Sequence, residues 1–323
     1  MAKKISVSAP GKVVLYGEHA VVYNRPCIVT AVDSRMHVTI HEIPGQEITI
    51  TAPEFDIQNY SLSKTNDEAP HKGIRFVKAI IDRMYQLYRL EKGLHIHTSN
   101  GFSSKYGLGS SSAVSVCTAK AISEFHNLKL SQKELFDVAY SAVLDVQGIG
   151  SGFDVAAAIW GGTLYFVTGG KKIDILSNTS LPIVITYSGT KADTPTIVKA
   201  LAKKRQKNIP KFDNYFDQIT QIVRSSKSIL KTQNWPEAGR LASANQRILQ
   251  KLGVSTQKLD HLCRVATKHG AFGAKLTGAG GGDCMISFVG EEHQERIKEA
   301  LTEAGGDIIP VSTGAEGVRI ELN

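Results

Sequence analysis

The 323-residue sequence lacks the features that define several broad classes of protein. It has no run of about 18 apolar residues, so no membrane-spanning helix is predicted. Its first residues carry no apolar core of the kind that a secretory signal peptide needs. Repeats and low-complexity tracts are also missing. We therefore expect a soluble globular protein with no membrane partner.

Cysteine is scarce and scattered. The four cysteines sit among apolar or small residues, and no two of them form a C-x-x-C pair; they are Cys27, Cys117, Cys263 and Cys284. This pattern fits reduced thiols in a core, in a protein of the cytoplasm.

Two familiar nucleotide-binding loops are absent. A Walker A loop needs a Lys after its second glycine, and Ala113 follows the serines of the best candidate stretch. A dinucleotide fingerprint needs a third glycine, but Ser112 stands at that place after Gly107 and Gly109. If the chain binds a nucleotide, it uses another type of loop.

Composition and charge are ordinary. Hydrophobic residues make up 42% and charged residues 21% of the chain, and the length suggests two domains. The net charge of +8 suits anionic substrates, and it would also suit nucleic acid. The densest basic cluster, Lys203, Lys204, Arg205 and Lys207, follows an apolar helical stretch without interleaved aromatics. We interpret it as a solvated helix end and predict no nucleic-acid partner.

A glycine loop at the centre of the chain is the most informative stretch. Gly107, Leu108 and Gly109 precede Ser110, Ser111 and Ser112, and an apolar run at 114–125 predicts a helix. Backbone N–H groups and the positive end of the helix dipole favour a phosphate there. Ser111 or Ser112 could add a hydroxyl to a phosphate-bound Mg²⁺. The alternative is a tight turn with a serine N-cap.

Two further glycine-rich segments follow this loop in the sequence. The segment 147–158 delivers one acid, Asp154, at the start of a small-residue helix, and the segment 275–284 follows later. A composition shift at 171–182 is the predicted domain boundary. Helices are predicted at 74–90, 114–125, 131–143, 196–204, 213–232, 237–252, about 255–268 and 292–304. Strands are predicted at 4–8, 12–16, 27–32, 36–41, 47–51, 93–98, 163–167, 183–187, 285–289 and 317–322, with a loop at 59–72.

The glycine segments, taken in order, resemble those of the GHMP kinase superfamily, which includes galactokinase, homoserine kinase, mevalonate kinase and phosphomevalonate kinase. Residues 9–12 and 17–23 are similar to the first motif of that family, residues 107–111 to the second and residues 277–282 to the third. The resemblance spans essentially the whole chain. It implies an α+β, two-domain GHMP kinase fold. The N-terminal domain (1–178) would resemble domain 2 of ribosomal protein S5, and the C-terminal domain (179–323) would be ferredoxin-like.

The resemblance also implies roles for named residues. Asp154 and Lys12 would be catalytic, with Lys12 holding Asp154 ionised. ATP would bind Lys105, Gly107, Leu108, Gly109, Ser110, Ser111 and Ser112, with Ser111 also touching Mg²⁺. The substrate would meet Glu18, His19, Thr277, Gly278, Ala279 and Gly280. Asp283 has no assigned role. A homodimer is possible by analogy.

The motifs differ in which molecule they suggest as the acceptor of the phosphoryl group. The first motif resembles mevalonate kinases, which favours the 5-hydroxyl of mevalonate. The middle of the chain, with 147–158 and 281–284, is closer to phosphomevalonate kinases. For a phosphorylated acceptor the candidate cations are Lys105, Lys191 and Arg247. Mevalonate kinases usually place a metal-binding Glu where Val143 stands, and the nearest acid is Asp145.

Two other classes of function remain open. One is a small-molecule or RNA-binding protein without activity on the same fold, against which the presence of Lys12, Ser111 and Asp154 argues. The other is a decarboxylase relative, whose third glycine segment would differ from 278–282.

Overall fold

The computed structural model describes residues 3–62, 71–101 and 104–322. Its N-terminal half is a large, mostly antiparallel sheet in the order β12-β1-β2-β5-β3-β4, in which β6 pairs with β2 and β7. The pair β3–β5 is parallel. The strands are β1 (Lys4–Tyr16), β2 (Pro26–Glu42), β3 (Ile48–Ala52), β4 (Ile57–Ser61), β5 (Leu94–Asn100), β6 (Thr163–Val167), β7 (Lys172–Ser177) and β12 (Arg319–Ile320).

Two long strands replace four short ones that the sequence predicted. The gap expected between the strands 4–8 and 12–16 lies inside β1, and the segments 27–32 and 36–41, predicted as two strands, are one strand, β2. The pairing partner jumps from Arg35 opposite Pro10 to Val32 opposite Gly11. Because this register shift absorbs the proline, which has no N–H to donate, the strand continues through it. Our predicted breaks were therefore wrong.

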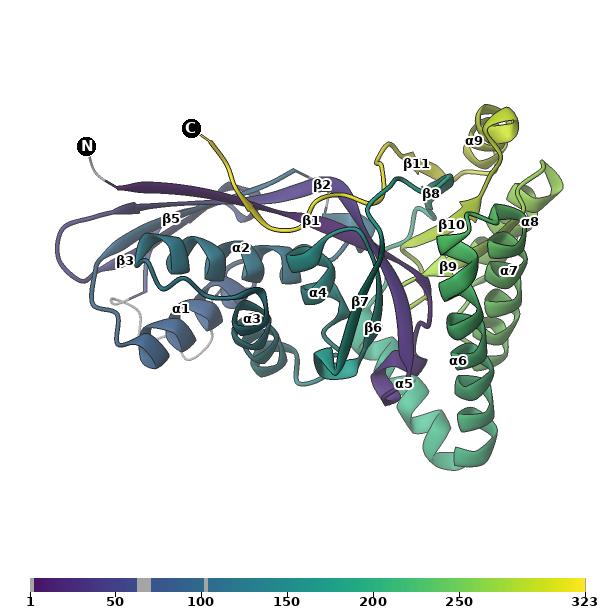
Figure 1. Cartoon of the computed structure of the whole chain (residues 1–323), viewed down its shortest axis with the longest axis horizontal. Coiled ribbons are helices and arrows are strands. Elements are labelled where there is room, and N and C mark those ends of the chain that lie inside the picture. The colour runs from purple at the N-terminus through teal and green to yellow at the C-terminus, as the bar shows by residue number, and fades with distance from the viewer. Residues whose placement is uncertain (1–2, 63–70, 102–103, 323) are drawn as a thin grey trace.

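Helices cover one face of this sheet, as Figure 1 shows, with α1, α2 and α3 below β1, β2 and β5. They are α1 (Arg75–Tyr88), α2 (Ser110–Phe125), α3 (Gln132–Gln147) and α4 (Phe153–Trp160). The sequence of α3 starts with a capping box, in which Ser131 and Glu134 bond each other's backbone N–H. Most of α2 is buried, whereas the glycine loop before it is partly accessible, with Gly107 exposed and Gly109 half-buried.

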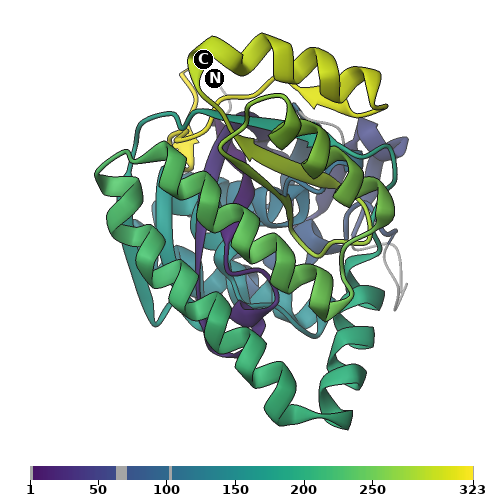
Figure 2. The ribbon, with the colours of Figure 1, turned by 90° about the vertical axis from the view of Figure 1, so that its right-hand side faces the viewer.

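The C-terminal half is a four-stranded antiparallel sheet, β11-β8-β10-β9, with long helices beside it (Figure 2). Its strands are β8 (Ile183–Tyr187), β9 (Gly273–Thr277), β10 (Cys284–Phe288) and β11 (Asp307–Ile309). Its helices are α5 (Thr194–Lys207), α6 (Ile209–Lys231), α7 (Trp235–Leu252), α8 (Gln257–Lys268) and α9 (Gln294–Glu303). Thr256 is the N-cap of α8, and the hydroxyl of the preceding Ser255 donates to Asp260 Oδ1.

Some strands were not predicted, because their sequences are polar or short. They are β4, β7 and β11. The predicted loop 59–72 was wrong at 59–61, which belongs to β4, and its part at 63–70 lies outside the described residues. Short 3₁₀ turns lie at 20–23, 53–55, 104–106, 168–170 and 291–293.

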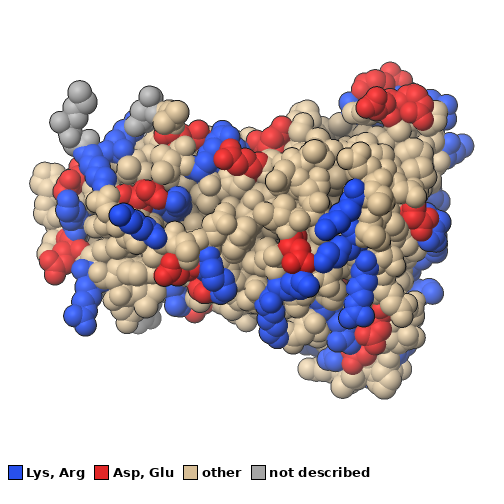
Figure 3. Space-filling view, in the orientation of Figure 1, with Lys and Arg blue, Asp and Glu red and all other residues tan. Residues whose placement is uncertain are grey.

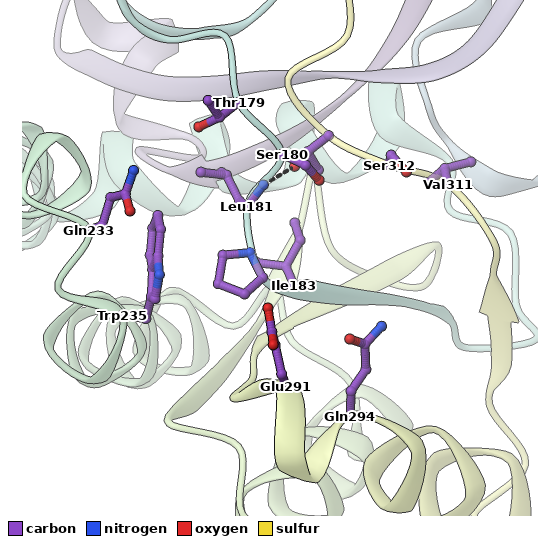
Figure 4. A pocket seen from close by; sticks show the side chains of 12 residues that line it. Thr179, Ser180, Leu181, Ile183, Gln233, Trp235, Glu291, Gln294, Val311 and Ser312 are labelled. Carbon is purple, nitrogen blue, oxygen red and sulfur yellow. Dashed lines mark hydrogen bonds between the residues drawn. The ribbon is translucent and has the colours of Figure 1, made fainter.

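The chain end returns to the first sheet. Strand β12 pairs with β1, and bridges join Val32 to Thr313 and Gly161 to Glu316, so both termini lie at one end of the molecule (Figure 1). A cavity of about 500 Å³ lies where the chain passes between the halves. Trp235 and Gln233 border one side of it, and Glu291 and Gln294 another (Figure 4).

The four cysteines are buried and unpaired, as expected for core thiols. No helix in the described part of the chain is long and apolar enough to span a bilayer. The basic cluster forms the last turn of α5, where Arg205 makes two bonds to Asp213 and lies over the Tyr23 ring. Lys and Arg side chains gather over the side of the molecule where α5 to α7 lie (Figure 3).

Candidate active site

The central glycine loop has the geometry of an anion site rather than of a serine-capped turn. Gly107 and Gly109 have φ values of 68° and 87°, a region that glycine adopts without steric cost. Gly109 is the N-cap of α2, and no side chain caps this end. The first N–H groups of a helix have no partner within the helix. They are therefore available to a phosphate at the start of α2.

Lys12 connects this loop to the second glycine segment. Its Nζ lies 3.0 Å from Asp154 Oδ1 and donates to the Gly107 carbonyl at 3.1 Å. Its backbone N–H donates to the Leu108 carbonyl at 2.8 Å. The Lys12 side chain is 9% exposed and that of Asp154 31%. The ammonium is thus fixed, whereas the carboxylate remains open to a ligand.

Glycine at position 109 makes this approach possible. A Cβ there would lie 3.1 Å from Lys12 Cε and 3.5 Å from Asp154 Oδ1. Asp154 itself stands in the first turn of α4, whose N-cap is Gly152 with a φ of 93°. The structure therefore brings Lys12 and Asp154, the residues expected to be catalytic, together with the glycine loop expected to bind phosphate.

Glu18 and Lys275 form a second pair of opposite charges, and it is sealed from solvent. Their side chains are 1% and 0% exposed, and Lys275 Nζ bonds Glu18 Oε1 and the Leu276 carbonyl. Burial raises the pKa of Glu18 and lowers that of Lys275, while their mutual attraction opposes both shifts. Among the described residues, Glu18 Oε2 has no partner. Glu18 thus lies behind the predicted substrate surface, and sequence reasoning missed its partner.

His19 is the buried neighbour of Glu18, with a φ of 60°. Burial lowers its pKa to about 4, so the ring is neutral near pH 7. Its Nε2 lies 2.9 Å from the Ala279 carbonyl, which can only accept. Nε2 must therefore carry the proton, and Nδ1 is left as an acceptor. Nδ1 of this neutral ring can accept a hydrogen bond from a substrate hydroxyl, but the ring has no positive charge with which to bind a carboxylate.

The third glycine segment closes against the first motif. The Thr277 hydroxyl donates to the Val14 carbonyl and accepts from the Val14 N–H, at 2.9 and 2.8 Å. A Cβ on Gly280 would lie 2.2 Å from the Val254 carbonyl, so only glycine fits. Gly278 has open space at its Cα. Thr277 therefore joins two parts of the chain, while Gly278 and Ala279 lie beside His19.

Lys105 is exposed and lies in the turn before the glycine loop. Ser111 and Ser110 are half-buried, and Ser112 is buried. Arg247 is exposed on α7. Asp283, to which the sequence assigned no role, lies against Gly107, since a Cβ there would come within 2.5 Å of its Oδ2.

The described residues include no group of three or more His, Cys, Asp or Glu side chains that could hold a metal. Val143, at the place of the usual Glu, is buried on α3. Asp145 pairs instead with Arg83 on α1 at 2.5 Å. A metal at this site would suit Mg²⁺, because that ion needs only one or two protein ligands beside phosphates and waters. Ser111 and Asp154 offer oxygens of that kind.

Comparison with known proteins agrees with this geometry. Residues 75–162 match the GHMP kinases N terminal domain, and residues 226–307 match the GHMP kinases C terminal domain. A mevalonate kinase from Thermococcus onnurineus is 32% identical, and the match covers 98% of each chain.

Solved structures show the same fold. The Methanococcus jannaschii mevalonate kinase has a TM-score of 0.79 and 28% identity, covering 99% of each chain. A protein from Listeria innocua has a TM-score of 0.89 and 23% identity, covering 99% of this chain and 100% of that one. The curated relatives favour mevalonate kinase over phosphomevalonate kinase. With its mixed α+β fold and its catalytic motifs, the chain belongs to the GHMP kinase family of ATP-dependent kinases.

Proposed function

We propose that this protein transfers the γ-phosphoryl group of ATP to the 5-hydroxyl of mevalonate. The observation that carries the proposal is the Lys12–Asp154 pair, 3.0 Å apart against the glycine loop. A mevalonate kinase relative that matches 98% of the chain supports the choice of acceptor.

The roles of the residues follow from their positions. Backbone N–H groups from Gly107 to Ser112 cradle the phosphates of ATP. Asp154 orients the acceptor hydroxyl and takes its proton as the new O–P bond forms and the bond from the γ-phosphorus to the bridging oxygen breaks. Lys12 stabilises the charge on the migrating phosphoryl group. Positioning and charge stabilisation supply most of the catalysis in such a transfer.

Mg²⁺ is part of the proposal. When bound, it neutralises charge on the phosphates. Ser111, with a hydroxyl in the first turn of α2, would hold it, and Lys105 would lie at the entrance to the ATP site. With Val143 in place of an acid, the nucleotide phosphates would supply most of the remaining ligands.

The acceptor end of the site rests on His19. Its Nδ1 would accept a hydrogen bond from a substrate hydroxyl, while Glu18 fixes the chain around it through Lys275. Gly278, Ala279 and Gly280 would border the substrate, and Thr277 would hold that border to β1. A neutral histidine suits the tertiary hydroxyl of mevalonate better than its carboxylate.

The proposal extends to organisation and location. Residues 1–178 would form the ATP-binding domain and 179–323 the second domain, although the end of the chain runs back along β1. Four unpaired, buried thiols support a location in the cytoplasm. A homodimer is the assembly expected by analogy with the family.

The test is an assay of ADP release with ATP and Mg²⁺. Mevalonate, 5-phosphomevalonate and 3-phosphomevalonate are supplied separately. Turnover with mevalonate alone is the expected result. Turnover only with a phosphorylated acceptor would contradict the proposal, and it would make the segment 147–158 the better guide to the substrate.

A further inference from the structure

Asp283 occupies an unusual place in the third glycine segment. Its φ is 52°, directly after Gly280, Gly281 and Gly282, which also have positive φ values. A residue with a side chain is uncommon in that conformation, although Asp tolerates it better than most. The residue is only 8% exposed. A buried charged side chain at such a position needs partners, and they come from two different segments.

The first partner is the loop between β8 and α5. The Ser188 N–H donates to the Asp283 carbonyl at 2.8 Å, and the Asp283 N–H donates to the Thr190 carbonyl at 2.7 Å. The side chain then adds a third bond, because the Ala192 N–H donates to Oδ1 at 2.9 Å. These bonds extend the pairing of β10 with β8 beyond Cys284 and Tyr187, where the two strands otherwise end.

The second partner is the phosphate loop. Oδ2 would lie 2.5 Å from a Cβ on Gly107, so the carboxylate occupies the space that only a glycine leaves free. Burial raises the pKa of Asp283, and the charges of Lys12 and Lys191 oppose that shift. A carboxylate so near bound phosphates would repel them without those two cations. One oxygen therefore faces the β8–α5 loop and the other faces Gly107.

The loop leads into α5, which lies over the same glycine segment. Ile197 Cδ1 would be 2.4 Å from a Cβ on Gly281 of that segment, whereas Lys204 Nζ, farther along α5, would be 2.9 Å from one on Gly253, the C-cap of α7. Leu201 is the buried residue of α5, so the helix has little apolar surface of its own to hold it. Its first turn follows the loop that Asp283 bonds, while Arg205 in its last turn bonds Asp213 of α6.

We propose that Asp283 is a positioning residue that holds the 188–207 segment against the phosphate loop. The Asp283 carboxylate then couples two events. One is the binding of nucleotide at the phosphate loop, and the other is the placement of Lys191 and α5 over the glycine segment. The coupling to nucleotide rests on the proposed function, whereas the role of Asp283 in holding residues 188–207 in place does not.

Two variants separate the side chain from its charge. Asp283→Gly keeps the φ value and removes Oδ1, so that the Ala192 N–H loses its acceptor. Asp283→Asn keeps an oxygen acceptor and the tolerance for positive φ while it removes the charge. The matched control is Asp56→Gly, since Asp56 has a φ of 57° and is exposed after a 3₁₀ turn away from the site.

The first measurement is the rate of tryptic cleavage after Lys191, Lys199, Lys203 and Lys204 without ligand, with the sites located by mass spectrometry. We expect Asp283→Gly to raise that rate roughly tenfold, as for loss of a charge-assisted hydrogen bond, and Asp283→Asn to stay within about threefold of the parent. Asp56→Gly should leave it unchanged. Equal cleavage rates in the parent protein and Asp283→Gly would contradict the proposal that Asp283 holds residues 188–207 in place.

The second measurement adds ATP and Mg²⁺ to the same digests. ATP should protect 188–207 in the parent and protect it less in Asp283→Gly, with a matching rise of the KM for ATP. Equal protection of both proteins would overturn the coupling, even if the ligand-free result holds. Loss of turnover on every acceptor, with protection intact, would contradict only the proposed function.

Discussion

The molecule contains two lysine–carboxylate pairs that start from the first motif, and they differ in burial. Lys12 and Asp154 lie 3.0 Å apart with 31% of the Asp154 side chain exposed. Glu18 and Lys275 are almost completely enclosed, at 1% and 0% exposure. Both pairs join residues far apart in the sequence. Only the first leaves a charged oxygen within reach of a ligand.

This difference suits the two pairs to different tasks. The open pair, Lys12 and Asp154, is placed to meet a ligand, whereas the sealed pair, Glu18 and Lys275, holds two segments of the chain together. A buried ion pair costs desolvation, and its attraction repays that cost only with good geometry, so such a pair says more about specificity of structure than about stability. Glu18 and Lys275 connect β9 to the chain before His19. The open pair can instead change partners when substrate arrives, which a general base requires.

Removal of the open pair should have the largest effect. Lys12→Met and Asp154→Asn should each lower turnover by more than ~100-fold, because each removes a group positioned for proton transfer or charge stabilisation. The measurement is kcat in the ADP-release assay, with a melting curve for each variant. Near-normal turnover in either variant would contradict the catalytic role assigned to the residue that it replaces. Loss of the folded state in either variant would show that the residue is needed for stability.

Breaking the sealed pair should act on stability. Lys275→Met leaves the Glu18 carboxylate buried without its cation, which typically costs about 3–5 kcal/mol of unfolding free energy. Urea unfolding followed by circular dichroism measures this loss. The double variant Lys275→Met with Glu18→Gln should recover much of it, because no buried charge remains. A double variant as unstable as the single one would show that the pair acts through packing rather than charge.

The contrast also explains what the sequence could predict. The glycine loop, Lys12 and Asp154 lie in short motifs whose residue types carry the information, so the sequence alone singled them out, and the structure brings Lys12 and Asp154 within 3.0 Å of each other. Lys275 lies in a strand, and none of the residues next to it in the sequence indicates that it pairs with Glu18. Asp283 had no assigned role for the same reason. Partners far apart in sequence are set by the fold and not by neighbouring residues.

The fold shows the same limit. Helices were predicted well because each carries its own periodicity and caps, as in the capping box of α3. Local signals failed at Pro10, where two separate strands were predicted and the structure has one, β1. A register shift against β2 accommodates that proline, and such a shift depends on the partner strand. The hydroxyl of Thr277, bonded to Val14, is equally invisible from either segment alone.

His19, next to the sealed pair, should make stability depend on pH. Its folded pKa of about 4 lies below the unfolded value of 6.5, so the unfolded chain binds the proton more readily. The neutral ring's contribution, roughly 3 kcal/mol, is present above pH 6.5 and is lost as pH falls toward 4. His19→Asn tolerates the positive φ and does not titrate. The difference in unfolding free energy between parent and variant should therefore narrow across that window, and a constant difference would contradict the buried neutral ring.

The smallest effect should come from an exposed pair, Arg83 and Asp145, with side chains 30% and 62% exposed. Asp145→Asn should cost less than about 1 kcal/mol, the usual value for ion pairs in contact with water. Asp145 is also the acid nearest in sequence to Val143, so its removal tests whether it serves the metal. Turnover and the Mg²⁺ concentration for half-maximal rate should both match the parent protein, since the carboxylate is bonded to α1. A clearly raised Mg²⁺ requirement in Asp145→Asn, with stability unchanged, would place this carboxylate in the active site. It would then remove the distinction between a surface ion pair such as Arg83–Asp145 and the open pair, Lys12 and Asp154, to which we assign catalysis.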